Sequence, residues 1–238
     1  MNNCLRNLFL PFGLLAVLTL SGCASVGETD PEDPFESYNR AIYSFNDGLD
    51  RAVIKPIAQG YNAVLPNPVN KGISNFFSNL DDVVVLFNDI LQFKFEQALS
   101  DTGRIVFNTT FGLLGFIDVS TELQLPKHNE DFGQTLGYWG VDSGPYFVLP
   151  ILGPSTIRDT GGIVVDSFVD PINEVEHSDD RLGLFVLKGI DTRAGLLSAS
   201  TILEEAALDP YLFVRGAYLQ RRQSLVFDGN PPPPTFED

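Results

Sequence analysis

Apolar side chains recur every three or four residues along much of this chain, and no other feature constrains its fold as strongly. Phe35, Tyr38, Ile42, Phe45 and Leu49 follow one another at spacings of 3, 4, 3 and 4. Side chains at this spacing lie on one face of an α-helix and leave the opposite face to polar residues. Because similar stripes recur toward both ends of the chain, we expect an all-α protein.

Residues that favour helix starts set the expected boundaries. Asp33 and Asp209, each followed by a proline, predict N-caps, and Glu36 completes a capping box with Asp33. The pair Asp81-Asp82 predicts a third cap. The expected helices cover residues 33–54, residues up to Tyr61 after a break or kink at Pro56, residues from Asn67 onward, and residues 81–93, 95–110, 155–168, 180–205 and 209–226.

The stretch from about 111 to 162 is rich in glycine and proline and interrupts the helical pattern. Gly133, Gly137, Gly140 and Gly144 repeat at spacings of 4, 3 and 4, so in a helix they would share one side. Glycines so placed let helices approach closely or let backbone line a narrow passage. Ordinary turn chemistry is an equal alternative for the last two. Residues 146–149, between two prolines, predict a short extended segment.

The N-terminal region carries the pattern of a bacterial lipoprotein signal. Residues 8–23 are mostly apolar, follow the cation Arg6, and end in Leu-Ser-Gly-Cys. The run is too short for a membrane-spanning helix, which needs about 20 apolar residues. We therefore expect residues 1–22 to be a signal peptide that is cut before Cys23.

Cleavage at this point would leave Cys23 as a lipid anchor. Its thiol would carry a diacylglyceryl group and its amine a further acyl chain, which together give stable membrane attachment. Ala24, rather than aspartate, follows the cysteine and favours delivery to the outer membrane, on its periplasmic side. We expect residues 23–32 to be a lipidated tether, and apart from these acyl groups we expect no cofactor.

The mature chain is strongly acidic. Without residues 1–22 it has 14 basic and 31 acidic residues, a net charge of −17. This charge argues against binding to nucleic acid and against a polybasic membrane anchor. Cys23 is the last cysteine left, so no intramolecular disulfide is expected. Residues 33–228 are long enough for one helical domain, and the proline-rich tail 229–238 is expected to be mobile or extended.

Catalytic motifs do not stand out, and we expect a protein that is not an enzyme. The chain has no Gly-x-Ser-x-Gly elbow, no Ser-x-x-Lys and no glycine-rich phosphate loop. His128 and His177 each lie among acidic residues, and a solvated acidic loop is the favoured explanation for both. The alternative at His128 is a metal site with Glu130 and Asp131.

The order of short motifs resembles the MlaA/VacJ family of outer-membrane lipoproteins. The matching stretches cover most of the mature chain. They are residues 33–40 with 43–46, 72–80, 107–110, Gly112, 115–119, 132–137, 144–146, 149–150, Gly153, 158–159, 170–171, 192–194 and 209–211.

This resemblance implies a ring of amphipathic helices in the periplasmic leaflet of the outer membrane, around a central channel. Family members remove phospholipid from the outer leaflet and so maintain lipid asymmetry. The implied partners are trimeric porins and a soluble periplasmic lipid carrier, which is linked to an inner-membrane ABC transporter.

The candidate lipid path follows from the same comparison. We assign Gly133, Gly137, Gly140 and Gly144 to the channel wall. Four aromatic residues, Phe35, Phe45, Phe76 and Phe77, are assigned to helix packing or lipid contact, and for any one of them core packing is the favoured interpretation. Two other functions remain open: a non-transporting envelope scaffold bound to porins, and a lipid hydrolase with a site at His128.

Overall fold

The structure, a computed structural model, describes residues 33–232, and almost all of its regular structure is helical. The helices are α2 (Glu36–Leu49), α3 (Lys55–Val64), α4 (Asn67–Leu91), α5 (Phe95–Thr110), α6 (Val119–Glu122), α7 (Phe132–Tyr138), α8 (Ile157–Asp166), α9 (Ser178–Gly195), α10 (Leu197–Ala206) and α11 (Pro210–Val226). The all-α prediction is confirmed. The signal peptide, Cys23 and residues 233–238 of the tail lie outside the described residues.

One small hairpin is the exception to the helical fold. Strand β1 (Tyr146–Leu149) pairs antiparallel with β2 (Gly153–Thr156), and Tyr146 lies opposite Thr156. The prediction of an extended segment at 146–149 is therefore confirmed. Tyr146 and Val148 point inward from this hairpin and pack with Tyr211 of α11.

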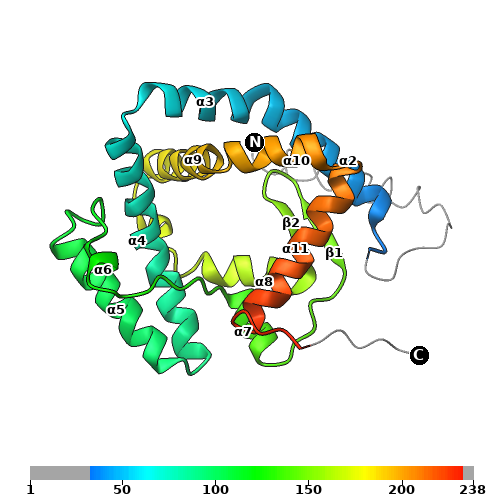
Figure 1. Ribbon diagram of the computed structural model, residues 1–238. Coiled ribbons are helices and arrows are strands. Elements are labelled where there is room, and N and C mark those ends of the chain that lie inside the picture. The colour runs from blue at the N-terminus through cyan, green and yellow to red at the C-terminus, as the bar shows by residue number, and fades with distance from the viewer. Residues whose placement is uncertain (1–32, 233–238) are drawn as a thin grey trace, which may run out of the picture.

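The helices follow one another around a ring (Figure 1). α3, α4, α8 and α11 form successive sides, α9 packs beside α3 and α4 within the ring, and α5 and α6 lie outside α4. α7 packs on α8 and also contacts α4 and α11, so it connects opposite sides. Among the described residues, no helix has both the length and the apolar character needed to cross a bilayer.

The first helix differs from the predicted one at both ends. It runs from Glu36 to Val64 without a break, because a π-helical turn at Asp50–Ile54 connects α2 to α3. Of the break or kink predicted at Pro56, the break is wrong. Proline in a helix lacks an N–H and clashes with the carbonyl four residues earlier, and here it falls in the first turn of α3, directly after the wider π turn.

Asp33 is not the N-cap of this helix. Phe35 occupies the N-cap position, and Asp33 is fully buried. Its carboxylate accepts hydrogen bonds from Asn39 Nδ2, at 2.7 Å, and from the Tyr211 hydroxyl. Tyr211, which is distant in sequence, therefore binds the Asp33 side chain that the local pattern assigned to the N-cap.

Asp81 and Asp82 do not start a helix either, because α4 passes through both without interruption. Lys188 of α9 pairs with Asp81, and Lys127 pairs with Asp82. The two carboxylates therefore bind cations from distant segments instead of capping a helix.

Other boundaries agree with the sequence pattern. α5 and α11 match the helices predicted at 95–110 and 209–226, and Asp209 caps α11 by accepting a hydrogen bond from Leu212 N at 3.2 Å. The helix predicted at 155–168 is α8. The one predicted at 180–205 is divided at Leu196 into α9 and α10.

Candidate functional site

The interior of the described region is more polar than that of an ordinary soluble domain. Its buried set includes 18 polar or charged residues and 10 apolar ones. Many large apolar side chains are exposed instead, among them Phe95, Leu99 and Phe111, which are 65%, 75% and 70% exposed. A large exposed apolar surface marks a region that contacts lipid or another protein, so these outer faces are candidates for such contact.

Helix α5 shows the inverted pattern most clearly. Its buried residues are Ala98, Asp101, Arg104 and Asn108. Its exposed apolar residues, together with those of the turn that follows, are Phe95, Leu99, Val106, Phe107, Phe111, Leu113 and Leu114. Because both sets recur at helical spacing, α5 presents an apolar face outward and a polar face toward α4.

Arg104 is the central cation of this polar interior. Its Nε lies 3.4 Å from Asp82 and its Nη2 lies 3.3 Å from Asp118. Its Nη1 donates to the Leu125 carbonyl at 2.8 Å. Burial raises the pKa of Asp82, and the neighbouring Lys127 only partly offsets this effect. The guanidinium thus joins α4, α5 and the start of α6.

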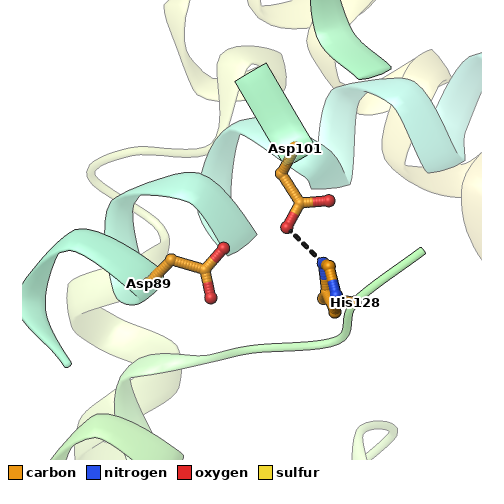
Figure 2. A group of neighbouring side chains, drawn as sticks. All are labelled: Asp89, Asp101 and His128. Atoms are coloured by element: carbon orange, nitrogen blue, oxygen red, sulfur yellow. Dashed lines mark hydrogen bonds and ion pairs between the residues drawn. The ribbon is translucent and has the colours of Figure 1, made fainter. Parts of the chain in front are cut away.

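A second polar group lies nearby and includes His128 (Figure 2). His128 Nδ1 is 2.8 Å from Asp101 Oδ2, and the imidazole is only 19% exposed. Asp89 of α4 lies beside this pair. Burial, strengthened by the nearby Asp101, raises the pKa of Asp89 to about 8.

This arrangement changes the interpretation of both histidines. The solvated loop expected at His128 is wrong, since its neighbour Glu130 is buried and bonded to Lys94. The alternative grouping with Glu130 and Asp131 is also wrong, because Asp131 binds Arg222. His177 is exposed just before α9, in agreement with its prediction.

A cavity of about 680 Å³ opens between the sides of the ring. Residues from α4, α7, α8, α9 and α11 line it, so it collects helices that are far apart in the sequence. Its apolar lining residues are Val84, Val85, Ile163, Phe185 and Leu225. Its charged lining residues are Asp81, Glu130, Asp131, Asp166, Asp170, Lys188, Arg221 and Arg222.

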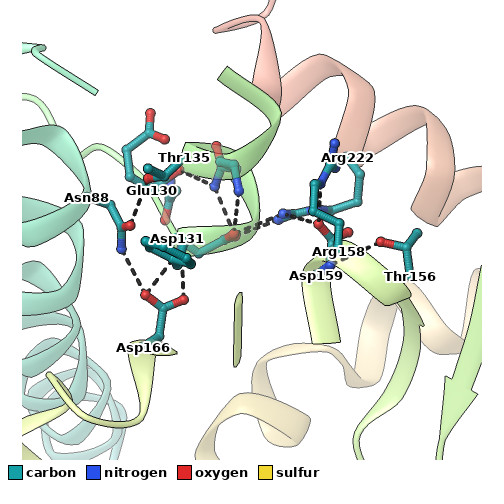
Figure 3. Close-up of polar contacts among 12 residues, drawn as sticks. Asn88, Glu130, Asp131, Thr135, Thr156, Arg158, Asp159, Asp166 and Arg222 are labelled. Atoms are coloured by element: carbon teal, nitrogen blue, oxygen red, sulfur yellow. Dashed lines mark hydrogen bonds and ion pairs between the residues drawn. The ribbon is translucent and has the colours of Figure 1, made fainter. Parts of the chain in front are cut away.

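Arg222 binds two carboxylates at the edge of this cavity (Figure 3). Its Nη2 lies 2.9 Å from Asp131 Oδ1 and 2.9 Å from Asp159 Oδ1. Burial alone would raise the pKa values of both aspartates, but the hydrogen bonds and charge of Arg222 outweigh burial and lower them. One guanidinium from α11 thereby holds α7 and α8 together.

The start of α7 is also held from the other side. Asp166 accepts hydrogen bonds from the Phe132 backbone N–H at 3.0 and 3.2 Å and from Asn88 Nδ2 at 2.9 Å. Asp131 caps the same helix by accepting a hydrogen bond from Gln134 N at 2.9 Å. The first turn of α7 is therefore fixed to both α4 and α8 (Figure 3).

The glycines assigned to the channel wall fall into two groups. Gly133 and Gly137 lie on α7 at close contacts. A Cβ on Gly133 would be 2.6 Å from Asp159 Oδ1, and one on Gly137 would be 2.8 Å from Val226. Both glycines therefore serve close helix packing, and their place in a channel wall stays a prediction.

Gly140 and Gly144 do not continue this helical side, because α7 ends at Tyr138. Their φ values are +85° and +66°, which favour glycine, so turn chemistry explains both. The prediction that a helix brings all four glycines together is wrong.

The four phenylalanines have different surroundings. Phe77 is buried and Phe76 stacks on Phe116 with ring centroids 5.2 Å apart, so core packing holds for this pair. Phe35 and Phe45 are 47% and 56% exposed. Core packing is wrong for Phe45, and lipid contact stays a prediction for it.

Sequence reasoning missed Asp89, Asp101, Arg104 and Arg222. Each belongs to a polar helix face, and such a face usually points to water. A signal was nonetheless present in α5, because its apolar set includes large side chains such as Phe95, Leu99 and Phe107. A helix with so bulky an apolar face can direct that face outward and enclose its polar face instead.

Comparison with known proteins places this geometry in context. The model of the family described as MlaA lipoprotein matches residues 31–225. The chain is 39% identical over 223 residues to "Intermembrane phospholipid transport system lipoprotein MlaA" of Escherichia coli (strain K12), and the match covers 90% of this chain and 87% of that protein. The protein of the same name from Haemophilus influenzae is 36% identical over 225 residues, covering 91% and 89%.

A solved structure has the same fold. It comes from work on the "Structural basis for maintenance of bacterial outer membrane lipid asymmetry" and is similar to this chain with a TM-score of 0.73 and 35% sequence identity. The similarity covers 83% of this chain and 99% of the solved one.

Proposed function

The chain belongs to the MlaA lipoprotein family, and from this membership we propose that it is the outer-membrane lipoprotein of an intermembrane phospholipid transport system. In this role it takes mislocalised phospholipid from the outer leaflet and passes it to a soluble periplasmic carrier, so that lipid asymmetry is maintained. The lipid leaves chemically unchanged, and the protein acts as a conduit instead of an enzyme.

The observation that carries the proposal is the inverted polarity of the ring around one cavity. Exposing acyl chains to water is unfavourable by about 0.8 kcal/mol for each methylene. Moving the charged headgroup through hydrocarbon is also costly, because a buried charge needs partners. Apolar outer faces such as that of α5 suit the acyl region of a leaflet, and the cavity offers apolar and charged walls together.

Arg221 is the cavity residue best suited to meet a lipid phosphate. It is exposed and lines the cavity, and no described side chain (residues 33–201 and 207–232) is hydrogen-bonded or ion-paired to it. By contrast, Arg222 is bound to Asp131 and Asp159, and Lys188 is bound to Asp81. A guanidinium binds phosphate oxygens through paired N–H donors, so Arg221 can receive a headgroup without losing another contact.

Attachment and partners follow from the same proposal. The acyl groups on Cys23 anchor the chain on the periplasmic side of the outer membrane, and the apolar face of α5 adds lateral contact with lipid. Trimeric porins hold the protein in place, and the periplasmic carrier, itself linked to an inner-membrane ABC transporter, receives the lipid.

A cavity-filling variant tests transport directly. Ile163 lines the cavity and is 45% exposed, while its neighbour Val164 is 55% exposed and lies outside the cavity. In cells that lack this chain, we expect Val164→Trp to restore low surface phospholipid and Ile163→Trp to leave it high. Surface phospholipid is measured by labelling intact cells, and equal amounts of both variants are verified by immunoblot.

Two further arms separate the other functions. Cys23→Ser is expected to fail, since the anchor is lost. If Ile163→Trp and Arg221→Glu both clear lipid as well as the wild type, the cavity is not the lipid path. If cells that lack this chain show no rise in surface phospholipid, a scaffold that does not transport is the better explanation. Lysophospholipid or free fatty acid that appears only with the wild type, measured by mass spectrometry, would instead indicate a hydrolase.

A further inference from the structure

Three side chains from separate segments meet between α4, α5 and the loop before α7. They are Asp89, Asp101 and His128, and one ligand atom of each lies within 4.8 Å of those of the other two. Figure 2 shows the carboxylates and the imidazole directed toward a common point. Neither the cavity nor the proposed lipid path uses these residues.

The two carboxylates lack the partners that buried charges normally have. Asp89 and Asp101 are 0% exposed. Within residues 33–232, both oxygens of Asp89 and Oδ1 of Asp101 accept no hydrogen bond. Buried ionised groups are expensive unless paired or bound to a metal, so this arrangement calls for a further positive charge.

Nearby cations do not supply that charge. Lys94 binds Glu130 at 2.9 Å and also binds Asp228. Arg104 and Lys127 are both directed to Asp82. Each of these three cations is therefore already paired with a carboxylate other than Asp89 or Asp101, and these two aspartates have only His128 beside them.

We propose that Asp89, Asp101 and His128 bind one divalent transition-metal ion, with Zn²⁺ as the preferred ion. His128 Nδ1 and Asp101 Oδ2 are 2.8 Å apart, a hydrogen-bond distance. Ligands at about 2.1 Å from a tetrahedral ion lie about 3.4 Å apart, so these two atoms would separate slightly when the ion replaces the shared proton. Imidazole nitrogen with carboxylate oxygen suits zinc better than calcium or magnesium, which prefer oxygen alone. A water molecule completes the coordination.

The role of this ion is structural. It joins α4, α5 and the segment that contains His128, and Glu130 and Asp131 of the same segment line the cavity. The alternative is a proton held between Asp89 and Asp101, with His128 charged. The two explanations differ in what happens when Asp89 becomes uncharged.

The test uses the full lipidated chain purified in detergent, with Asp89→Asn, His128→Ala and the matched control His177→Ala, which replaces the second of the chain's two histidines. We expect wild type and His177→Ala to contain about one zinc per chain by elemental analysis. Zinc chloride at a hundred times its dissociation constant should raise their melting temperature by roughly 5 to 10 °C over the value in EDTA.

Asp89→Asn separates the metal from the proton because it keeps the shape of the side chain. We expect it to fold in EDTA at least as stably as the wild type, while zinc affinity falls at least about tenfold and the zinc-dependent shift falls to about half or less at the same zinc concentration. His128→Ala should lose a similar part of the shift. The proposal is overturned if the wild type melts at the same temperature in zinc and in EDTA, or if Asp89→Asn and His128→Ala keep the full shift.

Discussion

The α4–α5 pair and the corner formed by the β1–β2 hairpin with α11 both have a buried interior, but the side chains enclosed there are of different kinds. α4 and α5 enclose charges, including Asp82 and Arg104. The corner encloses aromatic side chains, and the rings of Tyr146 and Tyr211 pack edge to face with their centroids 6.3 Å apart. The stability of a charged interior depends on every ion-pair partner being present, because a buried charge without a partner is costly. An aromatic side chain stabilises the fold mainly through the apolar area that it buries.

The largest effect is expected when a cation is removed from the charged region. Arg104→Met leaves Asp118 without its ion pair and Asp82 with Lys127 alone. We expect the free energy of unfolding to fall by about 3 to 5 kcal/mol, measured by denaturant titration in detergent. Arg51→Met, which removes an exposed pair with Asp47, should change it by less than about 1 kcal/mol. Similar losses for both variants would mean that the effect of Arg104 does not depend on the burial of its ion pairs.

A smaller effect is expected at the contact of α7 with α8, which joins the two regions. A Cβ on Gly162 would lie 2.4 Å from the backbone nitrogen of Gly133. Gly162→Ala should therefore destabilise the protein by about 2 to 3 kcal/mol. Its neighbour Gly161 has no atom within 4 Å of the added Cβ, so Gly161→Ala should stabilise the helix by about 0.5 to 1 kcal/mol. Opposite signs in thermal unfolding would confirm the close approach.

In the corner formed by the β1–β2 hairpin and α11, the hydroxyl groups of two tyrosines provide a sharper comparison. The Tyr211 hydroxyl donates to Asp33, so Tyr211→Phe should be destabilising by about 1 to 2 kcal/mol. The Tyr146 hydroxyl is buried and has no partner among the described residues, so Tyr146→Phe should change stability by less than about 0.5 kcal/mol. Equal losses in unfolding measurements would mean that Tyr146 has a partner as well.

The last comparison depends on pH. Asp101 and Glu130 face Asp89, with Lys94 and His128 nearby, and burial is the main reason that the pKa of Asp89 is raised to about 8. Because this value exceeds that of the unfolded chain, the stability linked to the protonated form is present at low pH and is lost as the pH approaches 8. With EDTA present, Asp89→Asn should therefore have little effect near pH 4 and stabilise the protein increasingly as the pH rises to 8.5. A gain that does not vary with pH would contradict this assignment.

Local patterns predicted helices well where neighbours in sequence decide the structure. The limits of α5 and α11, the cap at Asp209 and the strand at 146–149 all depend on adjacent residues. The same patterns failed at Asp33, whose partner Tyr211 is 178 residues away, and at Asp81, whose partner Lys188 is 107 residues away. A cap and one half of a distant ion pair look the same in a sequence.

The candidate site was harder to predict for the same reason. Arg222 meets Asp131 and Asp159 only after α11 returns to α7 and α8. The glycine spacing correctly placed Gly133 and Gly137 on one helix, but not the point at which that helix ends. The metal-like grouping of His128 needed α4 and α5, neither of which is adjacent to it in the chain.

The uninterrupted helix from Glu36 to Val64 limits how the molecule can be oriented. At 1.5 Å for each residue, it is about 40 Å along its contour, with a change of direction between α2 and α3 (Figure 1), whereas one leaflet has roughly 15 Å of hydrocarbon. Under the proposed function, in which the ring lies in one leaflet, this helix cannot stand upright there. The plane of the ring then lies nearly parallel to the membrane surface, and the opening through the ring points across the leaflet.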